Sequence, residues 1–378
     1  MSLIDVRSFG AKPDDPTFDN APAIMSALRK QRAGKGVDTV LLPDTLSGTP
    51  STYWCKSSIL HDNAGFNATI QGGGKTKVKF APNVPISTFR STSGDLQGKH
   101  LAAIGNYGAL TMLDVGFDFN GAQQLVLDAA GQPTMVGDTL RITGAKTVRA
   151  TNVPTYNQRG LTTRSSVNMP ETFAFQLLHV ADFVLDGCHQ ISLDGAPTAT
   201  GIVAHWSSGV IKNTFTGNVR GQGFGTYGNC KVTYESCWAD GVGHAYNLEG
   251  GNIGPQDIVI GKAGDPTKDC YSTNSRAALA MNGNPTAINS LSVEGLHSTN
   301  DRTVFIGTGA LPVTRPSLHG LVITDPTLNV FNLLAGTKNQ AWVNLLDVVN
   351  SKIHNSKNVP ILVPKTLTVP ASWQLVPF

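Results

Sequence analysis

The chain has 378 residues, enough for one large domain or two ordinary ones. Charged residues make up 15% of the sequence, against roughly 25% in an average globular domain, and hydrophobic residues make up 40%. This composition excludes a disordered chain, because such chains combine high charge with few apolar residues. A net charge of +3 argues against nucleic acid as a partner, and no apolar run approaches the roughly 18 residues that would predict a membrane span.

The five cysteines are widely spaced, and an odd number argues against a complete disulfide framework. We expect small, buried, apolar thiols. The closest pair, Cys230 and Cys237, makes a poor zinc site, because no His stands nearby at finger spacing. The first residues lack the basic-then-apolar pattern of a signal peptide, which leaves the location open between an extracellular protein released by processing and a virion tail.

Taken in chain order, the first predicted element is an amphipathic helix over residues 20–32. Asp19 or Asn20 can cap its start, and Ile24 and Leu28 share one face. Beyond the helix the sequence turns to apolar runs of a few residues, separated by Gly, Asn, Asp, Ser and Thr.

These runs form a repeat between residues 172 and 358. Each repeat holds two strand-like pieces separated by a turn, as in 201–205 followed by 209–211. A strand-rich period of about 20–33 residues without helices predicts a solenoid. The spacing of leucine-rich repeats and the longer blades of propellers are both missing. A parallel β-helix fits best, because each of its coils needs several short strands joined by turns of variable length.

The opening of the chain resembles that of the pectate-lyase-like family. Residues 4–15 read IDVRSFGAKPDD and residues 19–24 read DNAPAI, where the family has V-x-D-F-G-A-x-G-D-G and then D-D-T-x-A-I. Further matches are TVLLP at 39–43, IQGGG at 70–74 and LDVGFDFNG at 113–121. The family comprises polysaccharide lyases, glycoside hydrolases, mannuronan epimerases and phage tailspikes. The resemblance implies a right-handed parallel β-helix whose first strand and helix cap its open end.

We therefore predict an all-β protein with three parts. Residues 1–36 form an N-terminal cap of an edge strand and the amphipathic helix, residues 37–358 form the right-handed parallel β-helix, and residues 359–378 form an extended tail. A cap is needed because the end of a β-helix exposes unpaired backbone groups and apolar core.

Alternate residues of a strand point to opposite faces, and equivalent outward positions of successive coils stack about 4.8 Å apart. Aligning the repeats predicts one outward column of polar residues: His179, His205, Tyr227, Glu249 and Asn282. The inward positions beside it are apolar or small: Ile202, Ala204, Phe224, Thr226, Tyr246 and Leu248. Two interpretations fit this column, a polar ladder on a solvated sheet and a catalytic groove.

The resemblance favours the catalytic groove. Residues 222–227 lie where mannuronan epimerases carry Y-G-F-D-P-H, whose last His stacks against an Asp of the following coil. Tyr227 and Glu249 occupy these two positions here. Gln222 and Gly225 stand where the motif has Tyr and its first Asp. The resemblance therefore implies a site of this architecture without implying epimerase activity.

Two mechanisms suit the column. In β-elimination from a uronate, a base removes the proton beside the carboxylate and an acid protonates the leaving oxygen. His205 or His179 is the candidate base and Tyr227 the acid, while Arg220 and Asn247 are candidates to bind the substrate carboxylate.

Hydrolysis instead needs two carboxylates, about 5–5.5 Å apart for retention or 6.5–9.5 Å for inversion. Glu249 with Asp240 is the candidate pair. The column offers one acid, and not the acidic cluster that calcium requires, so we predict no metal and no cofactor.

The polar stretch 155–164 interrupts the coil rhythm and predicts a long loop. Its Arg159 and Arg164 either reach an anionic sugar or belong to a solvated loop. Trp206 follows an outward His, so strand alternation predicts that its indole points inward.

The function that best fits these features is cleavage of an extended, acidic polysaccharide along an outer groove, by lyase-type β-elimination. The alternatives are a glycoside hydrolase using Glu249 and Asp240, and a homotrimeric phage tailspike or depolymerase module that binds a glycan. A purely structural solenoid is a third possibility, in which the polar column is dispensable. The expected partner is a polysaccharide, with neither nucleic acid nor membrane.

Overall fold

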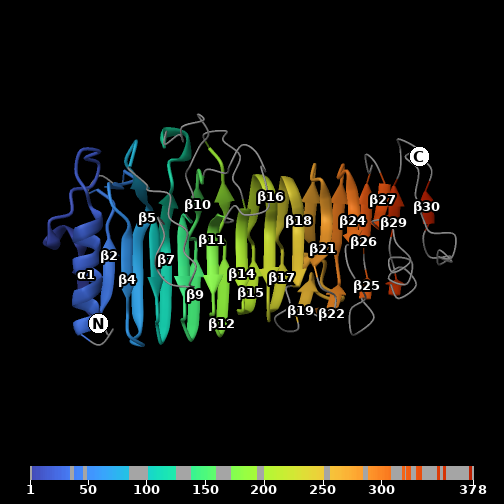
Figure 1. Ribbon diagram of the computed structural model, residues 1–378, viewed down its shortest axis with the longest axis horizontal. Coiled ribbons are helices and arrows are strands. Elements are labelled where there is room, and N and C mark those ends of the chain that lie inside the picture. The colour runs from blue at the N-terminus through green and yellow to red at the C-terminus, as the bar shows by residue number, and fades with distance from the viewer. Residues whose placement is uncertain are drawn as a thin grey trace. The chain divides into compact units, whose positions relative to one another are not determined.

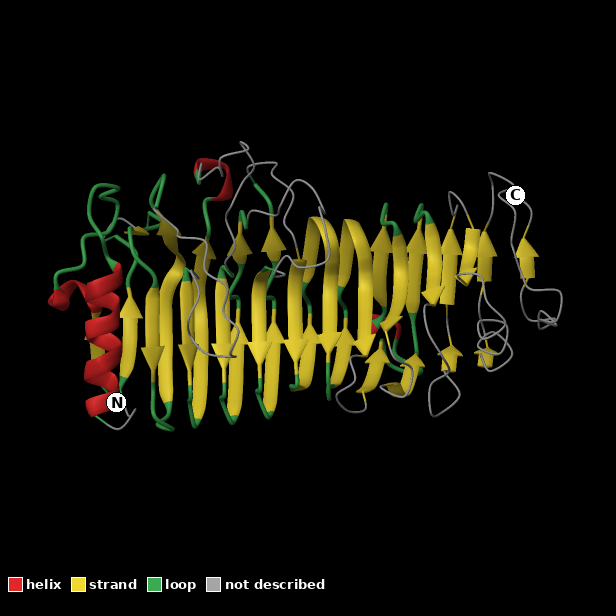
Figure 2. Cartoon of the chain, in the orientation of Figure 1, coloured by secondary structure: helices red, strands yellow, loops and turns green. Residues whose placement is uncertain are grey.

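The computed structural model divides the chain into two compact units, Met1–Ile202 and Val203–Phe378. It describes short strands between residues 317 and 376, and before them residues 2–34, 38–45, 49–84, 101–124, 138–158, 172–193, 200–250, 256–283 and 288–307. Within these ranges strands predominate, and α1 is the one α-helix (Figure 2). No helix among them is long and apolar enough to cross a membrane.

The first unit begins with β1, η1 and α1 and continues as short strands. Its elements are β1 (Leu3–Asp5), η1 (Val6–Phe9), α1 (Ala21–Ala33), β2 (Thr39–Leu42), β3 (Thr52–Cys55), β4 (Ile59–Asp62), β5 (Ala68–Phe80), β6 (Ala102–Gly105), β7 (Ala109–Asp118), η2 (Gly121–Gln123), β8 (Leu140–Thr143), β9 (Thr147–Thr151), β10 (Thr155–Tyr156), β11 (Phe173–Leu178), β12 (Asp182–Asp186) and β13 (Gln190–Ile191).

Strand β14 (Thr200–His205) runs across the division, and the second unit follows. Its elements are β15 (Ser208–Lys212), β16 (Phe215–Tyr227), β17 (Lys231–Glu235), β18 (Trp238–Gly250), β19 (Gln256–Ile260), η3 (Pro266–Lys268), β20 (Cys270–Thr273), β21 (Ala277–Gly283), β22 (Ile288–Val293), β23 (Leu296–Thr299), β24 (Thr303–Gly307), β25 (Ser317–His319), β26 (Leu321–Thr324), β27 (Asn329–Leu333), β28 (Asp347–Val349), β29 (Lys352–His354) and β30 (Gln374–Val376).

Within each unit the described strands pair in parallel, coil upon coil, which is the architecture of a parallel β-helix (Figure 1). In the first unit one inward stack runs through four successive pairings, from Ile4 to Val40, Ile70, Met112 and Ala150. All five side chains are buried. Burial of such stacks is the main favourable term in folding, because apolar area leaves water at every coil.

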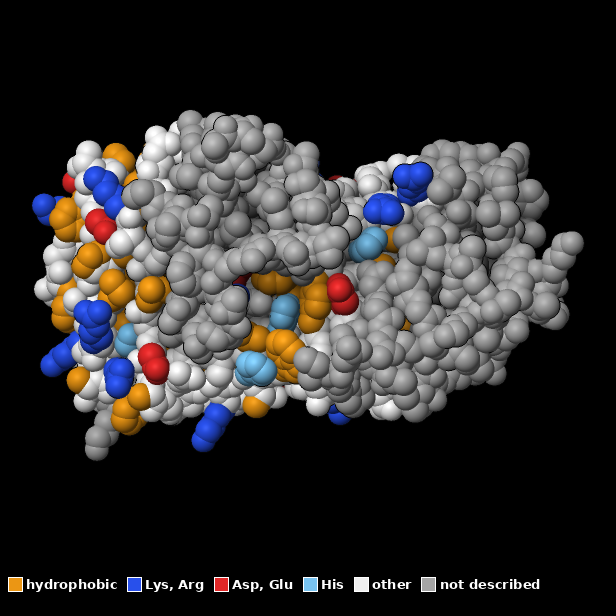
Figure 3. All heavy atoms as spheres, in the orientation of Figure 1, with side chains coloured by type: hydrophobic (Ala, Val, Ile, Leu, Met, Phe, Trp, Pro, Cys, Tyr) orange, Lys and Arg blue, Asp and Glu red, His pale blue; other side chains and the backbone are white. Residues whose placement is uncertain are grey.

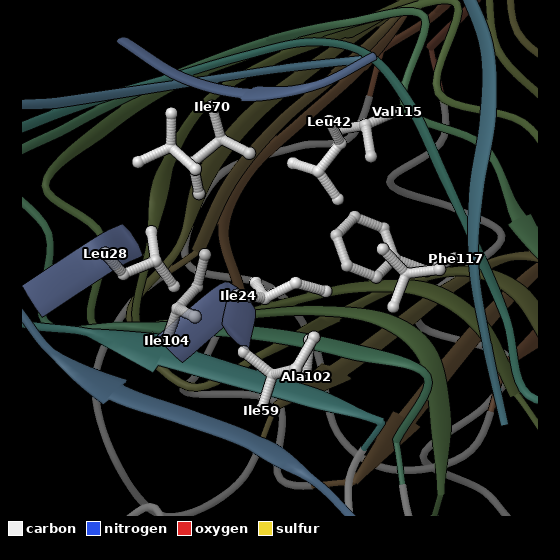
Figure 4. A pocket seen from close by; sticks show the side chains of 11 residues that line it. Ile24, Leu28, Leu42, Ile59, Ile70, Ala102, Ile104, Val115 and Phe117 are labelled. Atoms are coloured by element: carbon white, nitrogen blue, oxygen red, sulfur yellow. The ribbon is translucent and has the colours of Figure 1, made fainter. Parts of the chain in front are cut away.

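The N-terminal helix covers the open end of the first coils, as predicted. Helix α1 packs against β2 and β4 (Figure 1). Ile24 and Leu28 point into an apolar cavity that strand residues such as Ile70 and Phe117 complete (Figure 4). These two side chains are 4% and 1% exposed, so the helix closes the interior against water.

Of the two candidate caps of α1, Asp19 makes the capping bond. Its Oδ1 accepts a hydrogen bond from the backbone N–H of Ala21 at 3.1 Å, whereas Asn20 makes no side-chain cap bond. The Asn20 amide instead donates to the carbonyl of Trp54 at 2.9 Å. Both residues therefore fix the helix, one by capping it and one by tying it to β3.

Turns between strands are joined from coil to coil by side-chain amides. Asn152 donates to Asp114 at 2.8 Å in the first unit, and Asn274 donates to Asp240 at 2.8 Å in the second. Asn152 and Asn274 have φ angles of 53° and 52°, in the left-handed region that Asn tolerates better than most residues. Turn geometry and coil-to-coil bonding therefore favour the same residue type.

All five cysteines are buried free thiols, which confirms the prediction. Burial raises the pKa of Cys188 to about 12 and that of Cys230 to about 11. Both thiols therefore stay protonated near neutral pH, and protonated thiols are poor nucleophiles.

Within the predicted C-terminal tail, the described residues form β30, which pairs in parallel with β29. The other residues of 359–378 lie outside the described part of the chain.

Replacing Leu28 by Ala should lower the free energy of unfolding by about 2–5 kcal/mol, since a buried side chain is lost and a cavity remains. The measurement is a denaturant titration followed by circular dichroism. Arg29→Ala, on the exposed face of the same helix, is the matched control and should change stability by about 0.5 kcal/mol or less. Equal effects of the two substitutions would contradict the assigned role of α1.

Stability should also depend on pH through Asp301, a buried residue after β23. Its carboxylate accepts from the Ser275 N–H at 2.7 Å and from the Ser298 hydroxyl at 2.6 Å, yet burial raises its pKa to about 6. The unfolded chain loses this proton near pH 4, so the folded state binds more protons between pH 4 and 6. The stabilising contribution of protonated Asp301 is present below pH 4 and lost as the pH rises through 6.

The expected loss is on the order of 2–3 kcal/mol. Asp301→Asn should remove this part of the pH dependence, which urea titrations at pH 4.5 and pH 7 would measure. If the wild type and the variant change by the same amount between these pH values, Asp301 is not the responsible group.

Candidate functional site

Part of the predicted polar column lies in the second unit, on neighbouring strands that Figure 1 colours from yellow to orange. Tyr227 of β16 pairs with Glu249 of β18, and Glu249 pairs with Asn282 of β21. The ring of His205 lies beside that of Tyr227, with 4.5 Å between ring centroids and 34° between ring planes. His205, Tyr227 and Glu249 therefore occupy successive coils.

Strand alternation holds along this column. Phe224, Thr226, Tyr246 and Leu248, the neighbours expected to point inward, are all fully buried. The ring of Phe224 stacks on that of Tyr246 at 5.3 Å between centroids. Since these rings fill the interior, the residues between them must face outward.

Gln222 links two members of the column. Its side-chain N–H donates to the Tyr227 hydroxyl oxygen, and to Glu249 Oε2 at 3.3 Å. Gln222 is 5% exposed, so its amide is held almost out of water. In this bond the Tyr227 hydroxyl oxygen is the acceptor.

Gly225 provides the space that Gln222 occupies. A Cβ atom at position 225 would overlap Gln222 Oε1 and lie 3.4 Å from Tyr227 Cε2. The two departures from the epimerase motif are therefore linked in space, since a side chain at 225 would force the side-chain oxygen of Gln222 to shift.

Two buried amides bond to Glu249. Asn247, which is fully buried, donates to Glu249 Oε2 at 3.4 Å. Gln256 donates to the Glu249 carbonyl at 2.9 Å and accepts from the Thr226 hydroxyl at 2.9 Å. Asn247 was predicted as a ligand of the substrate carboxylate, but in the structure its amide donates to Glu249.

Aromatic surface borders the column. Trp206 does not point inward as strand alternation predicted, because β14 ends at His205 and Trp206 has a left-handed φ of 46°. Its indole lies over Gly228, and its ring centroid is 5.8 Å from that of His205. Hydrophobic, histidine and acidic side chains gather over β16 and the strands beside it (Figure 3).

The structure brings only some of the predicted residues to the column. His179 is an exposed residue of the first unit, one position beyond the end of β11, with a φ of 54°. Arg220 is exposed on β16, two residues before Gln222 and beside a register shift. Asn282 pairs with Glu249 through its backbone. Arg159 and Arg164 lie outside the described residues.

Asp240 lies on a different side of its coil from Glu249, although both belong to β18. The part of β18 that holds Asp240 pairs with β20, whereas the part that holds Glu249 pairs with β21. The Asp240 carboxylate accepts from the Thr273 hydroxyl at 3.0 Å and from the Asn274 amide at 2.8 Å. The Asp240 carboxylate is therefore hydrogen-bonded to the end of β20 and the turn that follows it.

No protein-family model matches this chain, and neither does any curated protein. Among solved structures, a family 28 exopolygalacturonase of Yersinia enterocolitica is similar at 12% identity with a TM-score of 0.62, over 94% of this chain and 72% of its own. The A-module of the Azotobacter vinelandii mannuronan C-5 epimerase AlgE6 gives 14% identity and a TM-score of 0.49, over 95% and 96% of the two chains. PfbA, a surface adhesin of Streptococcus pneumoniae, is similar at 12% identity with a TM-score of 0.46, over 93% of this chain and 92% of its own.

The chain has the right-handed parallel β-helix fold. This confirms the fold predicted from the sequence. At 12% identity the similarity to the exopolygalacturonase establishes the fold alone, so the chemistry of this β-helix has to be argued from its own side chains.

Among the described residues of the β-helix, no group of three or more His, Cys, Asp or Glu side chains is arranged to hold a metal ion. The described column offers ring, hydroxyl, amide and carboxylate groups. Such a set suits proton transfer and hydrogen bonding to a sugar.

Sequence reasoning missed Gln222 as a member of the site. The motif comparison carried a signal, because positions 222 and 225 both depart from the motif. One of them gains a long amide and the other loses its side chain altogether.

A double-mutant cycle tests the link between Gly225 and Gln222. Gly225→Ala alone should lower the free energy of unfolding by about 1–3 kcal/mol, because the new methyl group overlaps the amide of Gln222. In the background of Gln222→Ala the same substitution should cost at least about 1 kcal/mol less. Urea titration of the four proteins gives the coupling, and additive costs within about 0.5 kcal/mol would disprove the contact.

Proposed function

We propose that this protein cleaves an extended, acidic polysaccharide on the outer face of its β-helix by lyase-type β-elimination. The observation that carries the proposal is the Gln222 amide, which bridges the Tyr227 hydroxyl and the Glu249 carboxylate while the His205 ring lies beside that of Tyr227. A candidate base, His205, and a candidate acid, Tyr227, are thereby held side by side. The outer face of successive coils suits a linear polymer.

In this proposal His205 and Tyr227 carry the proton transfers. His205 takes the proton from the carbon that bears the uronate carboxylate. The electron pair forms the ring double bond as the glycosidic carbon–oxygen bond breaks, and the Tyr227 hydroxyl protonates the leaving oxygen. Solvent then accepts a proton from His205 and returns one to Tyr227, which restores both groups.

Glu249 and Asn247 act as positioning residues in this proposal. Glu249 fixes Gln222, and Gln222 fixes the hydroxyl of Tyr227. We assign Arg220 to the substrate carboxylate, since its exposed guanidinium lies two residues before Gln222 on β16. Arginine suits this role because its planar fork binds a carboxylate through two hydrogen bonds.

Hydrolysis by Glu249 and Asp240 is less well supported. A hydrolase needs its two carboxylates within about 9.5 Å on either side of one bond. Asp240 lies on the part of β18 that pairs with β20, and its carboxylate is bonded to Thr273 and Asn274. This placement favours β-elimination.

The discriminating assay incubates the protein with polygalacturonate, alginate and a neutral glucan while reducing ends and ultraviolet absorbance are recorded together. Each bond broken by elimination yields one reducing end and one ultraviolet-absorbing unsaturated uronate. Reducing ends without absorbance would replace the lyase proposal by hydrolysis. If neither reducing ends nor absorbance rise on any of the three polymers, a glycan-binding module is favoured.

On a polymer that the protein cleaves, His205→Ala and Tyr227→Phe should each lower kcat/KM by at least about 100-fold, the usual contribution of a general acid or base. Both variants should melt within a few degrees of the wild type, since both side chains are half-buried and do not belong to the apolar interior. Tyr271→Phe, which removes an exposed phenol hydroxyl from β20, is the matched control and should retain full activity. Full turnover by both column variants would exclude this site.

A further inference from the structure

The first unit has a groove of about 290 Å³ on its surface, which the proposed reaction does not use. Lys75, Lys77, Asp114, Gly116, Asn152 and Tyr156 contribute to its lining. Its volume is at the lower end of the range for small-molecule sites, about the size of a single ring.

An aromatic ring and an ammonium group meet in this groove. The Lys77 Nζ lies 4.4 Å from the centroid of the Tyr156 ring, a cation–π distance. Burial raises the pKa of Tyr156, so its phenol remains neutral near pH 7. The ring therefore holds the ammonium in place without neutralising its charge.

Lys79, two residues further along β5, differs in one respect. Its Nζ lies 5.3 Å from the centroid of the Trp54 ring, but it also forms an ion pair with Asp118 at 3.1 Å. Neither Lys77 nor Lys75 forms an ion pair among the described residues. The charges of Lys75 and Lys77 are thus not compensated by a described carboxylate, whereas the charge of Lys79 is compensated by Asp118.

The part of the groove that bears Lys75 is fixed by a carboxylate. The register of β5 and β7 shifts between Gln71 and Thr76, so residues 72–75 form a bulge. The Asp44 carboxylate accepts from the Thr76 hydroxyl at 2.7 Å and from the Lys75 N–H at 3.3 Å. Because this backbone is already fixed, less conformational entropy would be lost when a ligand binds to it.

Gly116 determines the depth of the groove. A Cβ atom at this position would lie 3.0 Å from Tyr156 Cε2 and 3.5 Å from Pro154 Cγ. A side chain would therefore push the tyrosine ring outward. The missing side chain at this position of β7 lets the tyrosine ring lie close to the strand.

The charges in the groove favour an anion. Asp114, its one described acid, accepts a hydrogen bond from the Asn152 amide at 2.8 Å. Two ammonium groups also line the groove, and the remaining wall includes Pro50 and Pro154, which suit the C–H face of a sugar. We propose that this groove binds one anionic sugar unit of a polysaccharide, through a carboxylate or sulfate on Lys77 and Lys75. This binding goes beyond the proposed cleavage, because it requires nothing of His205 or Tyr227.

Lysine acetylation of the wild-type protein tests the site directly. Saturating hexagalacturonate, a sulfated chondroitin hexasaccharide and neutral cellohexaose are added in turn, and the rate at each lysine is read by mass spectrometry. An anionic hexasaccharide should slow acetylation of Lys77 at least threefold while leaving Lys79 within a factor of 1.5. Cellohexaose should protect neither lysine. Protection by one anionic sugar alone identifies the recognised group as carboxylate or sulfate.

The variant Lys77→Met keeps an unbranched side chain on the Tyr156 ring and removes the charge. It should weaken binding of the protecting hexasaccharide at least tenfold by calorimetry at low salt, and Lys79→Met, the matched control, less than twofold. Added salt should reduce wild-type binding, because the contact is between charges that solvent ions can reach.

Equal protection of Lys77 and Lys79, no protection by either anionic sugar, or unchanged affinity in Lys77→Met would each overturn the proposal. These readouts do not depend on turnover. A protein that binds here but cleaves nothing would contradict the proposed reaction alone, and one that cleaves without protecting Lys77 would contradict the groove alone.

Discussion

The constraint on which this structure depends is the register of one coil on the next. In a parallel ladder a slip of one residue turns every side chain to the opposite face. Here the slip is opposed by interior rings such as Phe224 and Tyr246, which stack from one coil to the next. The Tyr246 hydroxyl donates to the Cys237 carbonyl at 2.8 Å. That bond satisfies the one polar atom of a large buried ring, and the stacked rings favour the register that is observed. The alignment of Tyr227 with Glu249 follows from it.

The fold was predictable because its signals are periodic and local. Short apolar runs at a regular period predict coils, and a single amphipathic helix ahead of them predicts a cap. The pairing of Tyr227 with Glu249 and of Glu249 with Asn282 required only the alternation of a strand. The coils, the cap and the paired column residues are all defined by the order of residue types along the chain.

Other features of the site depend on where strands end or bend. The residue types along the chain give little indication of these positions. Trp206 was predicted to face inward, but β14 ends one residue earlier and the indole lies over Gly228. Asp240 and Glu249 share a strand of 13 residues, yet the strand pairs with β20 at one end and with β21 at the other. A bend within a strand that keeps its pairing leaves no trace in the alternation of apolar and polar residues.

The asparagine turns have a consequence for how the molecule loses its structure. Asn152 bonds to Asp114 and Asn274 bonds to Asp240, so each amide reaches only the adjacent coil. The backbone ladder and the interior rings also act between neighbours. A molecule whose interactions are all between neighbouring repeats behaves as a one-dimensional array, in which a terminal coil loosens more readily than an inner one. Helix α1 closes one end of the first unit with apolar side chains, and fraying from that end must first displace the helix.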